Sequence, residues 1–242
     1  MEADASGGGT AAWRARRGVV LREALGVGVA VGTLGVSFGA LATASGLTVA
    51  QACALSVLAF TGGSQFAFIG VLAAGGTAFS AVTTALLLGV RNSLYGIRLA
   101  PDLDVARPWW RRALAAQLVI DETTAVAIAH EDDRRAFRLG FWATGAAVFV
   151  IWNAFTLLGA VLGQRVSDPA VWGLDAAVPA AFLALLWPRL HDHRSAQVAI
   201  GAAIVALVAV PFVPAGAPVL LAGVVAVAAA WRPPRAPGGD VR

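Results

Sequence analysis

The sequence predicts an all-α membrane protein, a polytopic helical bundle of about six to eight segments whose second segment is broken or re-entrant. The 242 residues are 58% apolar and 13% charged, whereas soluble domains have about 25% charged residues. Several apolar runs approach the roughly 20 residues that a helix needs to cross a bilayer. One uncharged stretch, from Gly32 to Gly75, is interrupted by small and polar clusters that a simple membrane anchor would not need.

The charge pattern excludes several other classes of protein. The net charge of +4 is carried by arginine, because the chain has no lysine. The arginines stand at the ends of apolar runs and are not interleaved with aromatic residues, which argues against nucleic-acid binding and for a role in membrane topology. The single cysteine, Cys53, excludes an intrachain disulfide framework, and no metal-ligand spacing is present. We therefore expect neither a metal nor a cofactor.

The chain divides into a disordered cytoplasmic tail over residues 1–20, one transmembrane domain over residues 21–231 and a C-terminal tail over residues 232–242. Arginines before the first apolar run place the amino terminus in the cytoplasm. Small residues around Ala42 leave a cleaved signal peptide as the alternative. An uncleaved helix over residues 21–44 is favoured, because its apolar run is long and further segments follow.

The second segment carries the first candidate site. Apolar residues 47–60 and 66–74 flank a polar cluster, so either one helix is broken in its middle or two half-helices form a re-entrant hairpin. Freed backbone groups must be buried in protein or line a wet cavity, and secondary transporters place substrate sites at such breaks. A glycine kink bonded to neighbouring helices is the alternative. The candidate substrate-binding residues here and in the first helix are Ser37, Phe38, Gly39, Thr61, Gly62, Gly63, Ser64 and Gln65.

The third segment, over residues 77–100, ends in a polar motif. Arg91 and Tyr95 share one helical face, and Arg91 with Asn92 and Tyr95 are candidate site residues. Arg91 either forks onto a buried carboxylate or extends to the headgroups. A charged loop over residues 101–112 follows.

Two acids, Asp121 and Glu122, stand near the centre of the next apolar run, residues 113–129. An acid inside a bilayer is costly, so its default role is a proton relay, an ion site or a buried pair, and Arg91 is the most plausible partner. The alternative is that this segment lies at the surface, where both acids are solvated. We predict that Asp121 and Glu122 couple transport to protons, and that residues 61–65 lie within reach of Asp121 or Arg91.

In the second half of the chain, the sequence predicts a mixed-charge loop over residues 130–138, in which His130 is solvated. A helix over residues 139–163 follows, with Asn153 in mid-span as a further candidate or as an interhelical bond. The remaining predicted segments cover residues 173–187, 196–212 and 216–231. A weak internal repeat relates Gly35–Phe60 to Gly159–Trp187 and would imply a duplicated transporter half.

Three motifs carry a family resemblance. SFGALATASGLTVAQACALSVLAFTGGSQF, VRNSLYG and LVIDETTAVAIA begin at Ser37, Val90 and Leu118. In this order and spacing they resemble the AzlC family, the large subunit of branched-chain amino acid exporters of the LIV-E type, over about residues 20–230. The family pattern has an asparagine two residues before this arginine and a histidine after it. Gly89 and Asn92 stand there instead, so a titratable group is missing.

The resemblance implies a secondary transporter in the cell membrane that exports valine, leucine, isoleucine and sometimes methionine, together with a small AzlD-type membrane subunit. The broken segment and the intramembrane acids favour export driven by the proton gradient. A channel or a non-transporting scaffold remains the alternative. An intramembrane enzyme is disfavoured, because the sequence has no paired histidines, HExxH motif or serine-protease constellation.

Overall fold

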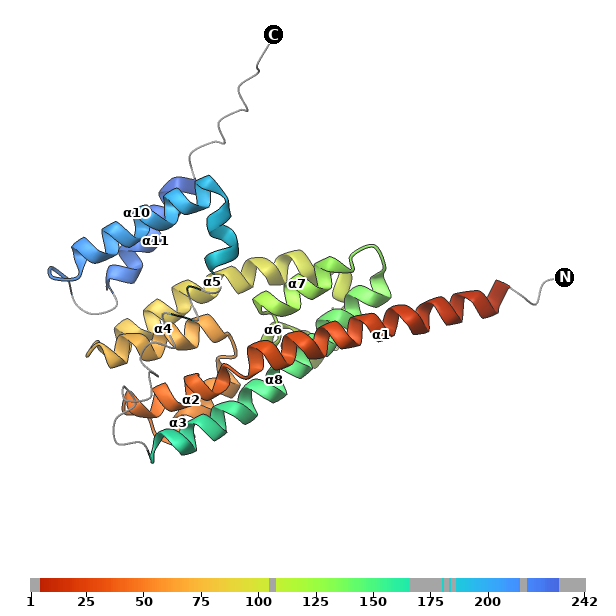
Figure 1. Cartoon of the computed structure of the whole chain (residues 1–242), viewed down its shortest axis with the longest axis horizontal. Helices are drawn as coiled ribbons and strands as arrows, with labels where there is room; N and C mark the ends of the chain where they lie inside the picture. Colours follow the sequence, from red (N-terminus) through yellow and green to blue (C-terminus); the bar gives the residue numbers. More distant parts are fainter. Residues whose placement is uncertain are drawn as a thin grey trace, which may run out of the picture.

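The computed structural model describes residues 5–104, 108–165, 180, 183, 186–213 and 217–230, and the regular elements in these ranges are helices. Two stretches, Thr10–Ala44 and Arg134–Gly163, are long and apolar enough to cross a membrane. Figure 1 shows the helices packed side by side in an elongated bundle. The predicted fold class, an all-α membrane bundle, is therefore confirmed.

One long rod forms the first part of the bundle. α1 (Ala5–Gly32) and α2 (Gly35–Ala44) are separated only by a bend at Thr33 and Leu34. α8 (Arg134–Gly163) packs along both of them and runs in the same direction (Figure 1). α1 begins at Ala5 and so extends over most of residues 1–20, for which the sequence predicted a cytoplasmic tail.

Glycines bring this rod and α8 into close contact. A Cβ on Gly28 would lie 2.6 Å from Ala147 Cβ. A Cβ on Gly39 would overlap the carbonyl oxygen of Thr156, and one on Gly159 would overlap that of Val36. Helices in lipid associate through such small residues, because apolar burial gives no net driving force there.

The predicted break in the second segment is a re-entrant hairpin. α3 (Val49–Leu58) starts just beyond the end of α2, where Thr48 and Gln51 form a capping box. The chain turns at residues 59–61, and α4 (Gly62–Ala73) returns to the same end of the bundle. The turn lies earlier than expected, since residues 62–65 form the first turn of α4.

A second hairpin enters from the other end. α5 (Ala78–Leu103) crosses the bundle antiparallel to α8 (Figure 1). From its far end α6 (Trp109–Gln117) leads inward, the chain turns at residues 118–120, and α7 (Asp121–Ala129) leads back. The predicted single segment over residues 113–129 is therefore two half-helices.

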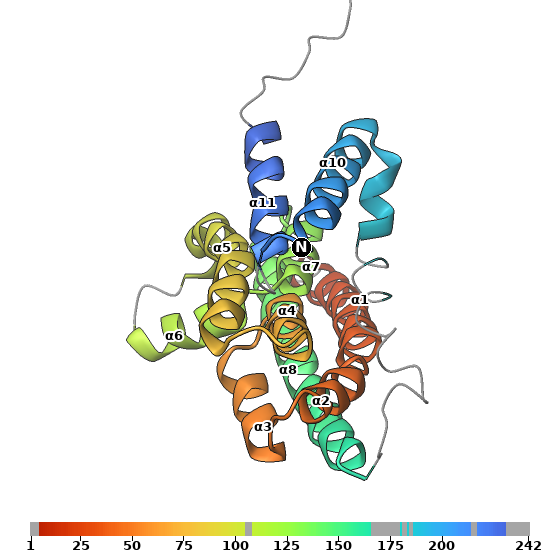
Figure 2. The same ribbon diagram turned by 90° about the vertical axis from the view of Figure 1, so that its left-hand side faces the viewer.

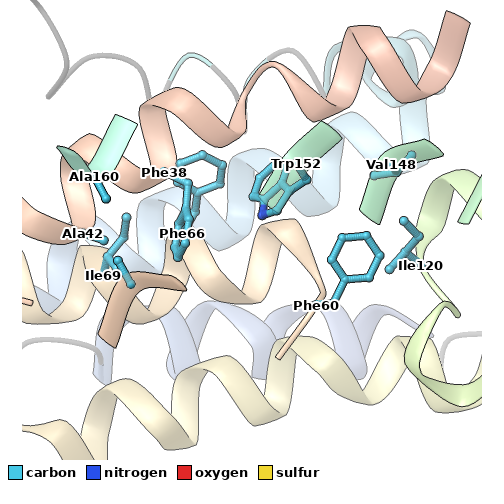
Figure 3. Packing of buried hydrophobic residues seen from close by; sticks show 10 residues of the cluster. Phe38, Ala42, Phe60, Phe66, Ile69, Ile120, Val148, Trp152 and Ala160 are labelled. Atoms are coloured by element: carbon cyan, nitrogen blue, oxygen red, sulfur yellow. The ribbon is translucent and has the colours of Figure 1, made fainter. Parts of the chain in front are cut away.

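The two hairpin tips touch in the middle of the bundle. Gln117 Nε2 donates a hydrogen bond to the Val57 carbonyl oxygen at 2.7 Å. Phe60 of the first tip and Ile120 of the second belong to one buried cluster (Figure 3). Figure 2 shows α4 and α8 near the centre, with α1 on one side and α5 on the other.

These elements form an inverted repeat. Residues 49–103 and 109–163 share one plan: a half-helix, a three-residue tip, a second half-helix, a four-residue connection and a long helix. Because α5 and α8 run in opposite directions, the two units are inverted relative to each other, as in many secondary transporters. The second copy of the repeat predicted from the sequence, Gly159–Trp187, lies largely outside the described residues.

Ion pairs gather at the end of the bundle where α1 and α8 begin and α5 ends. We call it the arginine end, defined by Arg16, Arg98, Arg134 and Arg138. Arg16 pairs with Asp132 at 2.5 Å, and this hydrogen bond lowers the pKa of the Asp132 carboxyl. Arg98 pairs with Glu131 at 2.7 Å.

His130 also belongs to the arginine end. Its Nε2 lies 2.8 Å from Glu23 Oε2, and its side chain is 15% exposed. The prediction that His130 is solvated is therefore wrong, because α1 extends far enough to cover it. The opposite end, defined by Gly46, Gly75 and Gly163, has no ion pair among the residues that the structure describes.

Other predicted boundaries also shift. α8 begins at Arg134, five residues before the prediction, because the Asp133 side chain accepts hydrogen bonds from the backbone N–H groups of Arg135 and Ala136. The predicted loop over residues 101–112 is helical at both ends. The final helices are α10 (His193–Ala209) and α11 (Ala217–Ala230), preceded by the 3-10 turn η2 (Trp187–His191). The predicted segment over residues 173–187 and the predicted tail over residues 232–242 lie largely or wholly outside the described residues.

Replacing Gly39 with alanine tests the close contact between α2 and α8. The added methyl group meets backbone of α8, and overpacking of this kind costs about 1–3 kcal/mol, or roughly 2–12 °C in a chain of this length. Gly26→Ala is the matched control, since its Cβ would meet nothing within 4 Å. Thermal unfolding of the detergent-solubilised protein measures both variants. Equal midpoints for the two variants would show that the contact does not hold the helices together.

Candidate functional site

A cavity of ≈ 60 Å³ lies in the middle of the bundle, beside the two hairpin tips. Its polar wall is formed by Thr61, Gly62, Gly63, Arg91, Asn92, Asp121 and Glu122. Its apolar wall is formed by Val31, Leu34, Phe66, Ile120 and Trp152.

Two helices begin at this cavity. α7 starts with Asp121 and Glu122, which place negative charge at the positive end of its own dipole. α4 starts with Gly62 and Gly63, which carry no side chain. Thr61 does not cap α4, because its hydroxyl donates to Ser64 Oγ at 2.9 Å. Gly62 and Gly63 line the cavity, and the first turn of α4 has no side-chain cap and no acidic residue to bind its free N–H groups.

An ion pair joins α5 to α7 across the cavity. Arg91 Nη2 lies 2.8 Å from Asp121 Oδ2, and the two side chains are 34% and 30% exposed. The pair uses one oxygen and one nitrogen, and Arg91 Nε and Asp121 Oδ1 are buried with no hydrogen-bond partner among the residues that the structure describes. Arg91 thus pairs with a carboxylate and does not extend to the lipid headgroups, although it contacts the carboxylate through one nitrogen and not as a bidentate fork. Glu122 lines the same cavity and has no ion pair within the described part of the chain.

Aromatic rings close the cavity on the side of α8. Trp152 stacks on Phe38 with ring centroids 6.0 Å apart and meets Phe66 edge to face at 5.9 Å. Trp152 is 2% exposed, and its indole N–H has no hydrogen-bond partner among the described residues. The candidate site named from the sequence includes the neighbouring Asn153 and not Trp152, although an indole in the middle of a transmembrane helix is itself an unusual polar group.

The structure gathers only part of the predicted site. Thr61, Gly62 and Gly63 line the cavity together with Arg91, Asn92, Asp121 and Glu122, so residues 61–63 lie within reach of Asp121 and Arg91. The predicted residues that are not among its lining residues are Ser37, Phe38, Gly39, Ser64, Gln65, Tyr95 and Asn153.

Several of these residues have a packing role instead. Gln65 is 1% exposed, and its amide donates to the carbonyl oxygens of Leu55 and Ser56 at 3.1 and 3.2 Å. Asn153 donates to the Phe149 carbonyl oxygen of its own helix at 2.8 Å. Tyr95 packs against a second buried cluster, around Phe141.

The donors and acceptors around the cavity suit a small zwitterion. Carboxylates and a guanidinium supply both signs of charge, and a helix N-terminus supplies N–H groups for an anion. Among the described residues no group of three histidine, cysteine or acidic side chains is placed to hold a metal ion.

The fold and the cavity define a polytopic membrane protein with two opposed re-entrant hairpins, an arrangement typical of membrane transport proteins. The chain belongs to the AzlC family, because the model of the AzlC protein family matches residues 26–166.

Two relatives support this assignment. An uncharacterized membrane protein of Archaeoglobus fulgidus is 31% identical over 169 residues, which cover 69% of this chain and 73% of the relative. The inner membrane protein YgaZ of Escherichia coli K12 is 30% identical over 167 residues, covering 66% of this chain and 67% of YgaZ. No solved structure matches the chain.

A double-mutant cycle tests the ion pair in the cavity. Arg91→Gln leaves Asp121 without its partner in a half-buried position, so it should destabilise the protein by about 1–3 kcal/mol, and adding Asp121→Asn should restore part of the loss. Arg98→Gln at the arginine end, where the side chain is 51% exposed, is the control and should cost less than about 1 kcal/mol. Thermal unfolding of the four proteins gives the coupling energy. Additive effects of Arg91→Gln and Asp121→Asn would show that the two side chains do not interact.

Proposed function

We propose that this protein is a secondary transporter that exports branched-chain amino acids, namely valine, leucine, isoleucine and methionine as an occasional substrate, and that protons drive the export. The observation that supports this function best is the cavity between two opposed hairpin tips, where the Arg91–Asp121 ion pair and Glu122 meet. A site in the middle of a bundle can be opened to either side by movement of the units around it.

An aliphatic amino acid matches the composition of the cavity. Its charged end meets the polar wall, and its side chain meets apolar residues such as Val31, Leu34 and Ile120.

Proton coupling requires a carboxylate whose charge changes during the cycle. Asp121 is held by Arg91, whereas Glu122 lines the same cavity without a basic partner among the described residues. When the ammonium group of a substrate approaches Glu122, the carboxyl group of Glu122 would lose its proton more readily. When the substrate leaves, Glu122 would take up a proton again. Binding of substrate and of a proton would thus oppose each other, as exchange across a membrane requires.

Replacing the two acids tests this coupling. Asp121→Asn and Glu122→Gln should each lower proton-driven export of valine at least about tenfold, or ~1.4 kcal/mol of barrier, because neither amide can gain or lose a proton. Glu131→Gln is the control, because Glu131 lies in an exposed pair at the arginine end. The measurement is efflux from cells that contain equal amounts of each variant in the membrane together with the partner subunit. Export by both variants at the wild-type rate would contradict the assignment.

The arginine end should face the cytoplasm in this proposal. The basic residues of α1, α5 and the start of α8 lie at that one end because both hairpins are re-entrant, and cytoplasmic segments are rich in arginine. If all segments crossed the membrane, the positive charges would be divided between the two sides.

Cysteine labelling tests this orientation. In a background with Cys53→Ser, a cysteine at Thr77 should react with an impermeant maleimide added to intact cells, whereas one at Asp132 should react only after permeabilisation. Labelling in the reverse pattern would mean that the arginine end faces outward.

The resemblance to the AzlC family also implies a small AzlD-type membrane subunit, and we propose that export requires it. Efflux should then depend on co-expression of such a subunit.

A further inference from the structure

The two helices that begin at the cavity differ in what their N-termini can accept. α7 carries its own acids, so its positive end is already balanced by Asp121 and Glu122. α4 begins with two glycines and has no side-chain cap. An N-terminus of this kind binds a carboxylate through backbone N–H groups.

A second group points to the same place. The indole N–H of Trp152 is buried without a hydrogen-bond partner in the part of the chain that the structure describes, and the ring lines the cavity. A Cβ on Gly62 would lie 3.7 Å from Trp152 Cη2, so the six-membered ring of the indole lies over the first turn of α4. Figure 3 shows the indole nitrogen on the side of the ring that faces α4. An unsatisfied buried donor costs free energy unless a ligand accepts its hydrogen bond.

From this geometry, and resting on the proposed function, we infer that the substrate carboxylate is held between the Trp152 indole N–H and the backbone N–H groups of Gly62 and Gly63, with the substrate ammonium group turned towards Asp121 and Glu122. This orientation places each end of the zwitterion beside the opposite charge. In this orientation Trp152 binds the substrate carboxylate, and the apolar wall of the cavity contacts the aliphatic side chain.

This mode of carboxylate binding would determine which substrates the transporter prefers. Leucine should bind, whereas leucinol, which has a hydroxyl group in place of the carboxylate, should bind more weakly because it offers these donors no charged acceptor. The part of this preference that depends on Trp152 disappears when the indole N–H is removed. Arg91 is the alternative partner for the substrate carboxylate. If Arg91 binds the carboxylate, the preference for leucine over leucinol should not depend on Trp152.

The experiment compares leucine and leucinol binding to the purified full-length chain, together with its partner subunit, by isothermal titration calorimetry. Trp152→Phe keeps an aromatic ring against Phe38 and Phe66 and removes the N–H. A second variant carries 3-benzothienylalanine at position 152, which replaces the N–H with sulfur and keeps the two-ring shape. Trp142→Phe is the matched control, because Trp142 packs on the second buried cluster of α8 and does not line the cavity.

We expect either change at position 152 to raise the Kd of leucine about tenfold and that of leucinol less than about twofold, so that the leucine preference shrinks. Trp142→Phe should leave both constants unchanged. If leucine and leucinol weaken equally, or the preference stays at its wild-type value in the benzothienyl variant, the carboxylate is not held by Trp152 and the inference is overturned. If the wild-type protein binds leucine but the preference is lost only in Arg91→Gln, the carboxylate belongs to Arg91. Failure of the wild-type protein to bind or export any branched-chain amino acid overturns the proposed function itself.

Discussion

The architecture depends on satisfying the backbone where the helices break inside the membrane. A helix that stops in the middle of a bilayer exposes carbonyl groups, which lipid cannot hydrogen-bond. Two glutamines meet this requirement at the end of α3: Gln65 donates to the carbonyl oxygens of Leu55 and Ser56, and Gln117 donates to that of Val57. Because Gln117 belongs to the other hairpin, the same hydrogen bond also joins the two tips. A stable break and a central cavity thus have one physical origin.

The surrounding helices keep this centre rigid on one side and allow movement on the other. α1 and α2 each contact α8 at glycines so closely that an added Cβ would meet its backbone. The first hairpin contacts α8 through side chains, among them the hydrogen bond from Ser56 Oγ to Thr156 Oγ1 at 3.2 Å. Side-chain contacts can be exchanged more readily than backbone contacts, so movement of this hairpin against α8 is the simplest way for the proposed transporter to open the cavity.

The two ends of the bundle are unequal. At the arginine end, ion pairs tie α1, α5 and the connection before α8 together, including Glu23 with His130. The described residues of the opposite end have no such pairs, and glycines with positive φ, Gly46 and Gly75, make its turns. Charges at the membrane surface are screened by salt and water, whereas the Arg91–Asp121 pair lies between the tips. The cavity therefore holds an ion pair that is set apart from those at the membrane surface.

Composition and motif order by themselves determined the membrane class, the helical fold and the candidate roles of Arg91 and Asp121, because these features follow from local hydropathy and from the cost of charge in lipid. Only the tertiary structure decided that both broken segments are re-entrant, since hydropathy is the same whether a half-helix continues or turns back. It also separated Gln65, which satisfies backbone carbonyl groups, from Gly62 and Gly63, which line the cavity. The sequence shows Trp152 as a polar group in mid-helix, but only the structure shows that its N–H has no partner among the described residues, because this depends on helices that are distant along the chain.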